Sequence, residues 1–330
     1  MEGFPDEKDG QMDREPYPVP DSKESWQVSE FLSVCIPSRN RASLLRDLLR
    51  SIGREIRSHA LTPRDVRVYV FDNASTDHTT RVYSEETEGL GSFFQYARHP
   101  QNIGPAGNQL LCARTGGGLY RWVIGDDEIL ADGALAYVLD LLRREAPAWM
   151  IVTDGKGYGR GLNPPEWFED VSDFVRVANR KDPEVLMTAG GWSMNIFRFD
   201  CFDHGLAAQL ADSSTYPHFF GMMRALKNRG GRVFFAGCPI VLFREQRPLP
   251  SDHELPADSD GNWRRCLEWL REEFNEPGID PESQSKAVSR RMIQEAMRHP
   301  WRALRNQGRL FLIPGTWVRV VRRVWFFFQR

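Results

Sequence analysis

The stretch Tyr120-Arg-Trp-Val-Ile-Gly-Asp-Asp-Glu128 does most to decide the fold of this chain. Its mostly apolar first half predicts a buried strand, which Gly125 ends. Three adjacent carboxylates follow, and such groups repel one another unless a cation or a basic side chain neutralises them. Oxygen ligands favour Mg²⁺ or Mn²⁺, which usually also bind substrate phosphates. The stretch therefore predicts a strand that ends in a metal-binding turn, and the alternative is a solvated acidic turn.

Segments on both sides of this stretch alternate between two periodicities. Short apolar runs predict strands, and apolar residues three and four positions apart predict amphipathic helices. The strands are predicted at residues 31–36, 66–72, 93–98, 120–124 and 149–152. The helices are predicted at 44–56, 75–82, 106–113 and 135–142, with Ser75 as a helix cap. This alternation indicates an α/β fold with a mostly parallel central sheet flanked by helices.

Polar residues gather where the predicted strands end. Ligands of such sheets bind at the carboxyl ends of the strands, so these clusters predict one binding site. The first cluster, residues 37–41, offers backbone amides and arginines to a phosphate, or it starts a capped helix. The second, residues 72–77, offers Asp72 to a nucleobase or ribose, or it is a turn whose acids favour a helix N-terminus. The third, residues 102–108, is rich in Gly and Asn and lets the backbone approach a diphosphate. The donor-binding candidates are Pro37, Ser38, Arg39, Asp72, Asn73, Asp77, Asn102, Gly104, Asn108 and Asp126.

The chain divides by composition into three predicted segments. Residues 1–28 are acidic and rich in proline, which predicts disorder. Residues 29–245 hold the α/β domain, with a further strand predicted at 192–199 and a helix at 216–228. Residues 246–330 form a predicted helical extension, with helices at 263–274 and 283–299. Residues 284–330 carry eleven basic residues and one acid, Glu295, so we expect this end to meet something anionic.

The last part of the extension mixes aromatic and basic residues. On a helix, Trp317, Val320, Val321, Val324 and Phe328 share a face, while Arg319, Arg322 and Arg323 gather elsewhere. This pattern is typical of a helix that lies in a membrane interface, and the alternative is a helix docked on the core. The acidic start is unlike a signal peptide, and the five scattered cysteines predict buried free thiols in a reducing compartment. We therefore expect a cytoplasmic protein, peripheral on the inner face of the membrane.

Four of these segments together resemble family 2 glycosyltransferases of the GT-A fold, over residues 31–245. Residues 33–41 resemble the opening strand and donor loop, 72–77 the nucleotide-binding segment and 102–108 the segment before the metal strand. The acids at 126–128 stand where the family has its DxD metal motif. The resemblance implies that Pro37, Arg39, Asp72 and Asn73 contact the nucleoside and that Asp126 contacts the ribose or the sugar. It implies Glu128 as the metal ligand, assisted by Asp127, for Mn²⁺ or Mg²⁺.

The chain departs from the family at the general base. Most members carry an acidic pair before a helix, and the matching positions here are Pro217 and His218. Histidine can serve as the base or bind the metal, and the alternative is a residue that starts the helix without a chemical role. Asp212 lies slightly upstream as a second candidate for the base. The Tyr-Pro-His form resembles a subset of the family similar to abequosyltransferases of bacterial surface-polysaccharide assembly. Trp192 and Asn195 are candidates for stacking on, and hydrogen bonding to, an acceptor sugar, and core packing of Trp192 is the alternative.

The function implied is inverting, metal-dependent transfer of a sugar from a nucleotide-diphosphate donor to an acceptor hydroxyl, in a lipid-linked glycan. One alternative is a catalytically silent sugar- or nucleotide-binding module recruited to the membrane. Another is a sugar nucleotidyltransferase, which would normally show a lysine-bearing, Gly-rich phosphate loop that residues 37–41 lack. Nucleic-acid binding is not expected, because the basic tail is interrupted by an aromatic block.

Overall fold

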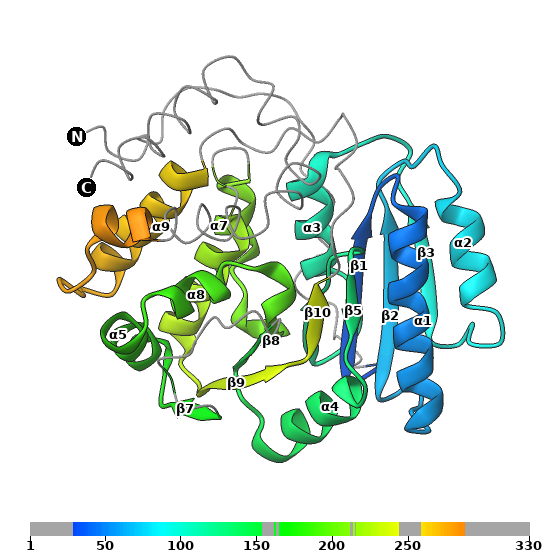
Figure 1. The fold of residues 1–330 in the computed structure, drawn as a ribbon, viewed down its shortest axis with the longest axis horizontal. Coiled ribbons are helices and arrows are strands. Elements are labelled where there is room, and N and C mark those ends of the chain that lie inside the picture. Colours follow the sequence, from blue (N-terminus) through cyan, green and yellow to red (C-terminus); the bar gives the residue numbers. More distant parts are fainter. Residues whose placement is uncertain are drawn as a thin grey trace, which may run out of the picture.

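A computed structural model describes residues 29–153, 162, 165–211, 214, 216–243 and 259–287 of the chain. Its first half alternates strands and helices, as Figure 1 shows. The elements are β1 (Leu32–Ser38), α1 (Ala42–Ser58), β2 (Val66–Asp72), α2 (Thr79–Glu86), β3 (Phe94–Arg98), α3 (Gly104–Arg114), β4 (Tyr120–Val123), β5 (Glu128–Leu130), α4 (Ala134–Glu145) and β6 (Trp149–Thr153). The strands and helices predicted in this half are confirmed, apart from shifts at their ends.

The second half is less regular. It contains β7 (Glu166–Phe168), α5 (Val171–Lys181), α6 (Glu184–Ala189), the 3-10 helix η1 (Trp192–Met194), β8 (Asn195–Arg198), the 3-10 helix η2 (Phe199–Cys201), α7 (His204–Gln209), α8 (Pro217–Arg229), β9 (Val233–Pro239), β10 (Val241–Phe243) and α9 (Ser259–Glu273). Residues 281–287 are also helical. The strand predicted at 192–199 is therefore shorter than expected, because Trp192 lies in the turn of η1 before β8 begins.

One eight-stranded sheet organises the described residues, with strand order β3-β2-β1-β4-β8-β6-β9-β7. β1 is parallel to β2 and β4, β2 is parallel to β3, and β6 is parallel to β9. β8 runs antiparallel between β4 and β6, and β7 is antiparallel to β9. A two-stranded ladder pairs β5 with β10, so that Glu128 lies opposite Phe243. The predicted α/β fold with a mostly parallel sheet is confirmed.

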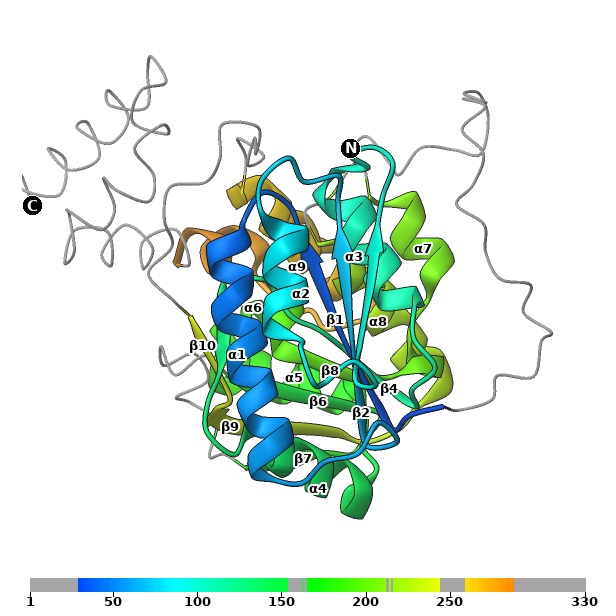
Figure 2. The same cartoon turned by 90° about the vertical axis from the view of Figure 1, so that its right-hand side faces the viewer.

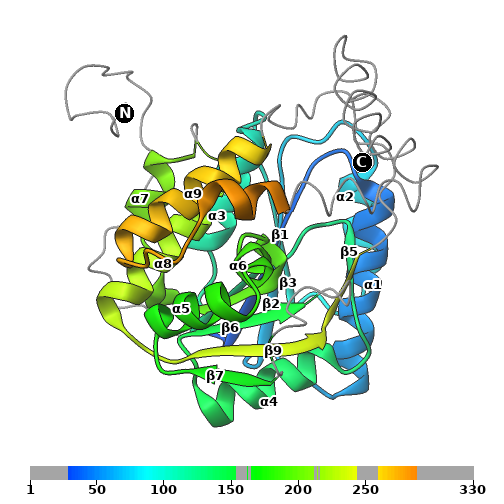
Figure 3. The ribbon, with the colours of Figure 1, turned by 60° about the vertical axis from the view of Figure 1, so that its left-hand side comes forward.

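Helices cover both faces of the sheet, because successive strand residues point to opposite sides. Val34, Val68 and Trp122 pack in one core with apolar residues of α1 and α4. Cys35, Phe71 and Val123 pack in the other core with α3, α5, α8 and α9. Each of them directly follows a strand residue that belongs to the first core. Figure 2 looks onto α1 and α2 in front of the strands, and Figure 3 shows α5, α8 and α9 together over β6 and β9.

The extension predicted at 246–330 begins outside the described residues, but α9 belongs to the same core as α8. Trp263 and Trp269 of α9 contact Phe219 and Phe220 edge to face. The domain boundaries remain a prediction, as does the disorder of residues 1–28, which the structure does not describe. Four cysteines, at 35, 112, 201 and 266, are buried free thiols, as predicted. Within the described residues, no helix combines the length and the apolar character that a membrane crossing requires.

Candidate active site

The carboxyl ends of β1 and β2 lie side by side, because the register pairs Ser38 with Asp72. The backbone N–H of Asn73 donates to the Ser38 carbonyl over 2.9 Å, which continues the pairing beyond the strands. Both strands then turn sharply, with Asn40 at φ 52° and Ala74 at φ 57°. These are left-handed conformations that non-glycine residues adopt only when surrounding contacts hold them there. The loop after β1 (residues 38–41) and the loop after β2 (residues 72–77) are therefore held against each other as one unit.

The acidic turn, residues 126–128, follows β4. Two residues of the first loop, which follows β1 at residues 38–41, hold its Asp126. Ser38 Oγ donates to Asp126 Oδ2 over 2.7 Å, and Arg41 Nη1 donates to Asp126 Oδ1 over 2.9 Å. The same Arg41 nitrogen lies 3.5 Å from Asp127 Oδ2. Burial raises the pKa of Asp126 to about 6, although the Arg41 charge opposes this rise. Arg41 is the site residue that the sequence-based candidates miss: it belongs to the first polar cluster, but only the fold shows which carboxylates it pairs with.

The chemistry of the acidic turn suits a divalent cation. A Cβ built on Gly125 would lie 2.8 Å from Asp127 Oδ1 and 3.5 Å from Glu128 Oε1, so both carboxylates converge on this glycine. The part of the chain that the structure describes contains no group of three or more His, Cys, Asp or Glu side chains placed to hold a metal ion. Two carboxylates completed by substrate phosphates are nevertheless a usual Mg²⁺ site. The residues fit a cation that arrives with a diphosphate, rather than one caged by protein alone.

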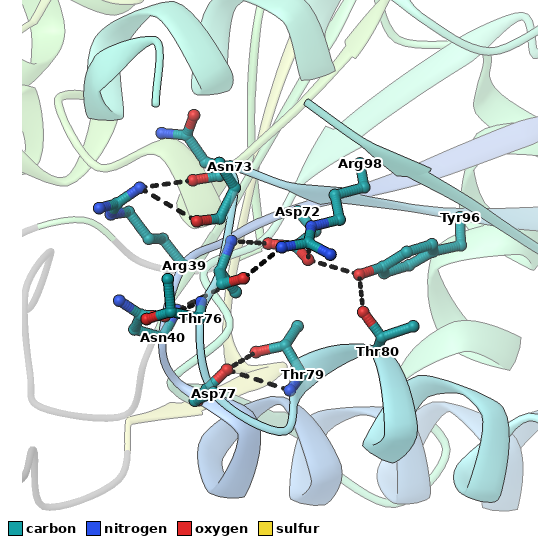
Figure 4. Close-up of polar contacts among 12 residues, drawn as sticks. Arg39, Asn40, Asp72, Asn73, Thr76, Asp77, Thr79, Thr80, Tyr96 and Arg98 are labelled. Carbon is teal, nitrogen blue, oxygen red and sulfur yellow. Dashed lines mark hydrogen bonds and ion pairs between the residues drawn. The ribbon is translucent and has the colours of Figure 1, made fainter. Parts of the chain in front are cut away.

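Asp72 is the centre of the second loop (Figure 4). Its Oδ1 accepts from the Ser75 N–H over 2.8 Å, and its Oδ2 accepts from the Tyr96 hydroxyl. Arg98 Nε lies 3.6 Å from the same carboxylate. Burial, together with the bond to Asp72, raises the pKa of Tyr96 to about 12. Asp72 is fully buried, so these contacts give it a role in shaping the loop; its predicted contact with the nucleoside remains a prediction.

The predicted cap at Ser75 is wrong, because α2 begins only at Thr79. The N-cap residue is His78, whose side chain makes no capping bond. Asp77, one residue earlier, accepts from the Thr79 N–H over 3.0 Å through Oδ1 and from the Ala42 N–H over 3.1 Å through Oδ2. Asp77 therefore joins the start of α2 to the start of α1. Arg39 donates to the Asn73 carbonyl over 2.8 Å and so holds the two loops together as well (Figure 4).

The three asparagine candidates fasten the third loop to the end of β2. Asn73 Nδ2 donates to Asn102 Oδ1 over 2.8 Å and to the Gly104 carbonyl over 3.1 Å, and its Oδ1 accepts from the Ile103 N–H. Asn108 Nδ2 donates to the Phe71 carbonyl over 3.0 Å. Gly104 has φ 79°, which glycine adopts without strain. The structure thus brings these residues together beside Asp72, where their donor contacts remain predictions.

His218 and Trp192 meet on the other side of the acidic turn. Their rings stack with centroids 3.9 Å apart. His218 Nε2 lies 2.9 Å from the Gly190 carbonyl, which can only accept, so Nε2 carries the proton and Nδ1 presents a lone pair. Burial lowers the pKa of His218 to about 3. Within the described residues, His218 Nδ1, Trp192 Nε1 and Thr188 Oγ1 are buried atoms without a hydrogen-bond partner.

The segment 188–195 connects this aromatic pair to the acidic turn. Ser193 Oγ accepts from the Gly125 N–H over 3.0 Å, and the Ser193 carbonyl accepts from Trp122 Nε1 over 2.8 Å. Asn195 is buried, with Nδ2 donating to the Ala189 and Gly191 carbonyls and Oδ1 accepting from Trp149 Nε1. Through these contacts Asn195 fixes the conformation of residues 188–195. Its contact with an acceptor sugar stays a prediction. Asp212 lies outside the described residues.

A mostly parallel sheet with helices on both faces and an acidic turn after β4 gives the chain the architecture of GT-A glycosyltransferases. The family model for glycosyl transferase family 2 matches residues 33–204, and the chain belongs to this family. Abequosyltransferase RfbV of Salmonella typhimurium is 28% identical over 230 residues, which are 65% of this chain and 66% of that protein. The match thus spans slightly less than two thirds of either sequence.

Solved structures agree with the fold. TarS 1–349 of S. aureus in complex with UDP-GlcNAc superposes with a TM-score of 0.50 at 15% identity, covering 73% of this chain and 66% of TarS 1–349. The mannosyltransferase PcManGT of Pyrobaculum calidifontis, in complex with GDP-Man and Mn²⁺, gives a TM-score of 0.51 at 15% identity, over 91% of this chain and 87% of that one. At these identities the likeness shows the fold alone.

Proposed function

We propose that this chain transfers a sugar from a nucleoside-diphosphate donor to an acceptor hydroxyl, with inversion at the anomeric carbon. The observation that carries the proposal is the buried acidic turn, where Ser38 and Arg41 of the first strand end hold Asp126 beside Asp127. A turn of this kind at the carboxyl ends of parallel strands is suited to binding a nucleotide. Family membership supports the same reaction class.

On the donor side, the two interlocked loops form the wall against which a nucleoside would lie. Asp72 and the asparagines at 73, 102 and 108 fix the conformation of these loops. Arg39 and Arg41 add positive charge beside them. Glu128 and Asp127 would hold Mn²⁺ or Mg²⁺. The cation would stabilise the charge that develops on the departing diphosphate.

On the acceptor side, His218 Nδ1 and Trp192 Nε1 offer a hydrogen-bond acceptor and a donor to a hydroxyl group. An imidazole with a pKa of about 3 is a weak base, so we assign His218 to orienting the hydroxyl. We assign the base to Asp212, the second of the two candidates predicted from the sequence, which lies outside the described residues. As the bond from the acceptor oxygen to the anomeric carbon forms, the bond to the diphosphate oxygen breaks, and the base takes the acceptor proton.

For the acceptor we propose a lipid-linked glycan used in surface-polysaccharide synthesis. The support is the relation to an abequosyltransferase and the basic and aromatic residues at 317–328, which lie outside the described residues. Such a tail would place the enzyme on an anionic membrane, where a lipid-linked acceptor is found.

The proposal is tested by thermal shift with UDP, GDP, CDP and TDP, each with Mn²⁺ or with EDTA. We expect one nucleotide to raise the melting temperature of the wild type only with Mn²⁺, because a ligand of the folded state stabilises it. Glu128→Ala should lose this effect. Nucleotide-sugars of that nucleotide are then incubated with the protein, and release of the nucleoside diphosphate is measured. Binding without release would favour a silent module, and no shift with any nucleotide would overturn the donor site.

A further inference from the structure

Arg41 occupies an unusual place at the start of α1. It precedes Ala42, the first residue of the helix, and its guanidinium extends to the carboxylates of both Asp126 and Asp127. The Arg41 side chain is 19% exposed, whereas that of Asp126 is 2% exposed. The ion pair is therefore largely withdrawn from water, and removing one partner would leave a buried charge without compensation.

The neighbouring arginines of α1 behave differently. Arg46 and Arg50 pair with Glu85 and Glu86 of α2, at the outer surface of the molecule. Arg39 donates to backbone carbonyls of the second loop. Arg41 contacts Asp126 and Asp127 of the acidic turn, and Arg46, which pairs with Glu85, provides a matched control on the same helix.

A guanidinium and a divalent cation both require the carboxylate oxygens of this turn. A metal ion that approaches alone must displace Arg41 from Asp127, and from Asp126 if that residue also turns toward the ion. Displacement from Asp127 breaks an ion pair at 3.5 Å, and displacement from Asp126 also breaks a charge-assisted hydrogen bond of 2.9 Å. A metal ion that arrives with a nucleoside diphosphate brings negative oxygens, and these offer the displaced guanidinium a new partner that it can bind in bidentate fashion.

We propose that Arg41 is an exchangeable counter-ion that couples binding of the metal to binding of the donor diphosphate. In the free protein it neutralises the acidic turn and opposes binding of a lone cation. When the diphosphate and the cation are both present, Arg41 moves its ion pair to the diphosphate and leaves the carboxylates to the metal. The inference rests on the proposed function, and it gives Arg41 a positioning role within the same site.

Coupling of this kind is reciprocal. If the nucleotide raises the affinity for the metal by some factor, the metal must raise the affinity for the nucleotide by the same factor. Without Arg41, a lone cation no longer competes with this guanidinium, and the diphosphate loses a partner. The coupling factor should therefore fall from both directions.

The test is calorimetric titration of the full chain with Mn²⁺, in the presence and absence of whichever of UDP, GDP, CDP and TDP stabilises the wild type. For Arg41→Gln we expect Mn²⁺ alone to bind about tenfold more tightly than to the wild type. We expect the nucleotide to improve Mn²⁺ binding about tenfold less than in the wild type, within the usual range of coupling energies. Arg46→Gln should match the wild type in both quantities.

Arg41→Lys keeps the charge but lacks the planar fork that binds a diphosphate in bidentate fashion, so its coupling factor should lie between those of the wild type and Arg41→Gln. This variant also covers the case in which Arg41→Gln fails to fold. A wild type that binds Mn²⁺ and nucleotide, with unchanged coupling in the Arg41 variants, overturns the inference alone. A wild type that binds neither overturns the proposed function and this inference with it.

Discussion

Asp72 and Asp126 are both buried carboxylates at strand ends, but they are neutralised in different ways. Asp72 is held by a backbone N–H and the Tyr96 hydroxyl, with Arg98 at 3.6 Å. Asp126 is held by the Ser38 hydroxyl and by the ion pair with Arg41. Backbone and hydroxyl partners are built into the loop, whereas an arginine can exchange one anion for another. At the scale of residues, Asp72 therefore keeps the shape of the site and Asp126 lies where its charge balance can change.

His218 shows how burial sets the chemistry of a single residue. Its ring is buried against Trp192, so the protonated form loses hydration and the pKa falls to about 3, although the hydrogen bond to the Gly190 carbonyl opposes this fall. Burial also lowers the pKa of His204, to about 4. Both rings are consequently neutral at physiological pH. Neutral imidazole can accept a hydrogen bond from a hydroxyl, which imidazolium cannot.

The buried His218 predicts loss of stability in acid. Below about pH 6.5 the imidazole of the unfolded chain takes up a proton, while folded His218 stays neutral down to about pH 3. The unfolded state binds more protons across this window, so the free energy of unfolding falls by up to about 1.4 kcal/mol for each unit that the pH decreases. His218→Phe, measured by urea unfolding at pH 7, 6, 5 and 4.5, should show a slope smaller by about one proton.

The control for this measurement is His78→Gln, which changes an exposed imidazole and leaves the buried ring of His218 in place. His204 stays in place in both variants, so part of the acid dependence persists. If the wild type and His218→Phe lose stability in parallel between pH 6.5 and pH 4.5, His218 is accessible to protons in the folded state and the assignment is wrong.

Helix α1 links the acidic turn to the rest of the first half. Arg41 stands at its start, Ser51 in its middle accepts from the Leu130 N–H of β5, and Glu55 reaches α4. Glu55 Oε1 accepts from the Gly133 N–H over 2.8 Å, and Oε2 accepts from the Leu135 N–H over 3.1 Å. The first N–H groups of α4 have no partner within their own helix, and a negative charge is favourable there. One element thus holds both the turn and the segment that follows it.

Removing the Glu55 carboxylate should destabilise the fold through α4. Glu55→Ala leaves two N–H groups without their acceptors in a buried place, and we expect a loss of roughly 2–4 kcal/mol in the free energy of unfolding. Glu55→Gln keeps an acceptor oxygen and should lose less, about 1 kcal/mol. Urea unfolding at pH 7 measures both, with Glu85→Ala as the control for an exposed glutamate, which should change stability by less than about 1 kcal/mol. Equal losses for Glu55→Ala and Glu85→Ala would contradict the capping role.

The elements differ in how far the sequence predicts them. α1 is predicted well, because Leu45, Leu48, Leu49 and Ile52 repeat at helical spacing and all are buried. The cap that Glu55 gives to α4 joins residues about 80 positions apart, so no local pattern indicates it. α5 lies where no helix is predicted above, although the signal is present. Asp170 caps it by accepting from the Asp173 N–H, and Val171, Phe174, Val175 and Ala178 form its buried face.

At the scale of the whole described molecule, one eight-stranded sheet joins a parallel half to a half with mixed strand directions. The half that begins the chain is parallel, so its strand ends meet at one edge, and sequence alone therefore predicts the donor side. β8 enters antiparallel between β4 and β6, and it carries η1 and the Trp192–His218 pair to the acidic turn. The order of these strands depends on tertiary pairing that no periodicity encodes. The acceptor side could therefore be predicted as single residues, but their contacts could not.

Charge is distributed unevenly over the chain as a whole. The described residues contain exposed arginines that pair with acids, such as Arg50 with Glu86 and Arg54 with Asp132. Residues 284–330 instead carry eleven basic residues and one acid, so most of this charge has no acidic partner within its own segment. Clusters of this kind beside aromatic residues favour an anionic membrane surface, with about 1 kcal/mol for each basic residue near it.

The tail should bring the full chain to anionic vesicles. Changing Arg319, Arg322 and Arg323 together to Gln removes about 3 kcal/mol of attraction, so binding to vesicles of phosphatidylglycerol and phosphatidylcholine should weaken about a hundredfold. Flotation measures this, and added salt should weaken wild-type binding as it screens the charges. The matched control changes three exposed arginines of α1, Arg50, Arg54 and Arg57, to Gln and should float like the wild type. If both triple variants float equally, the tail does not hold the enzyme at the membrane. The other outcome is that only the tail variant fails to float with the vesicles, while its melting temperature still rises with nucleotide and Mn²⁺. Membrane attachment and donor binding then reside in separate parts of the molecule.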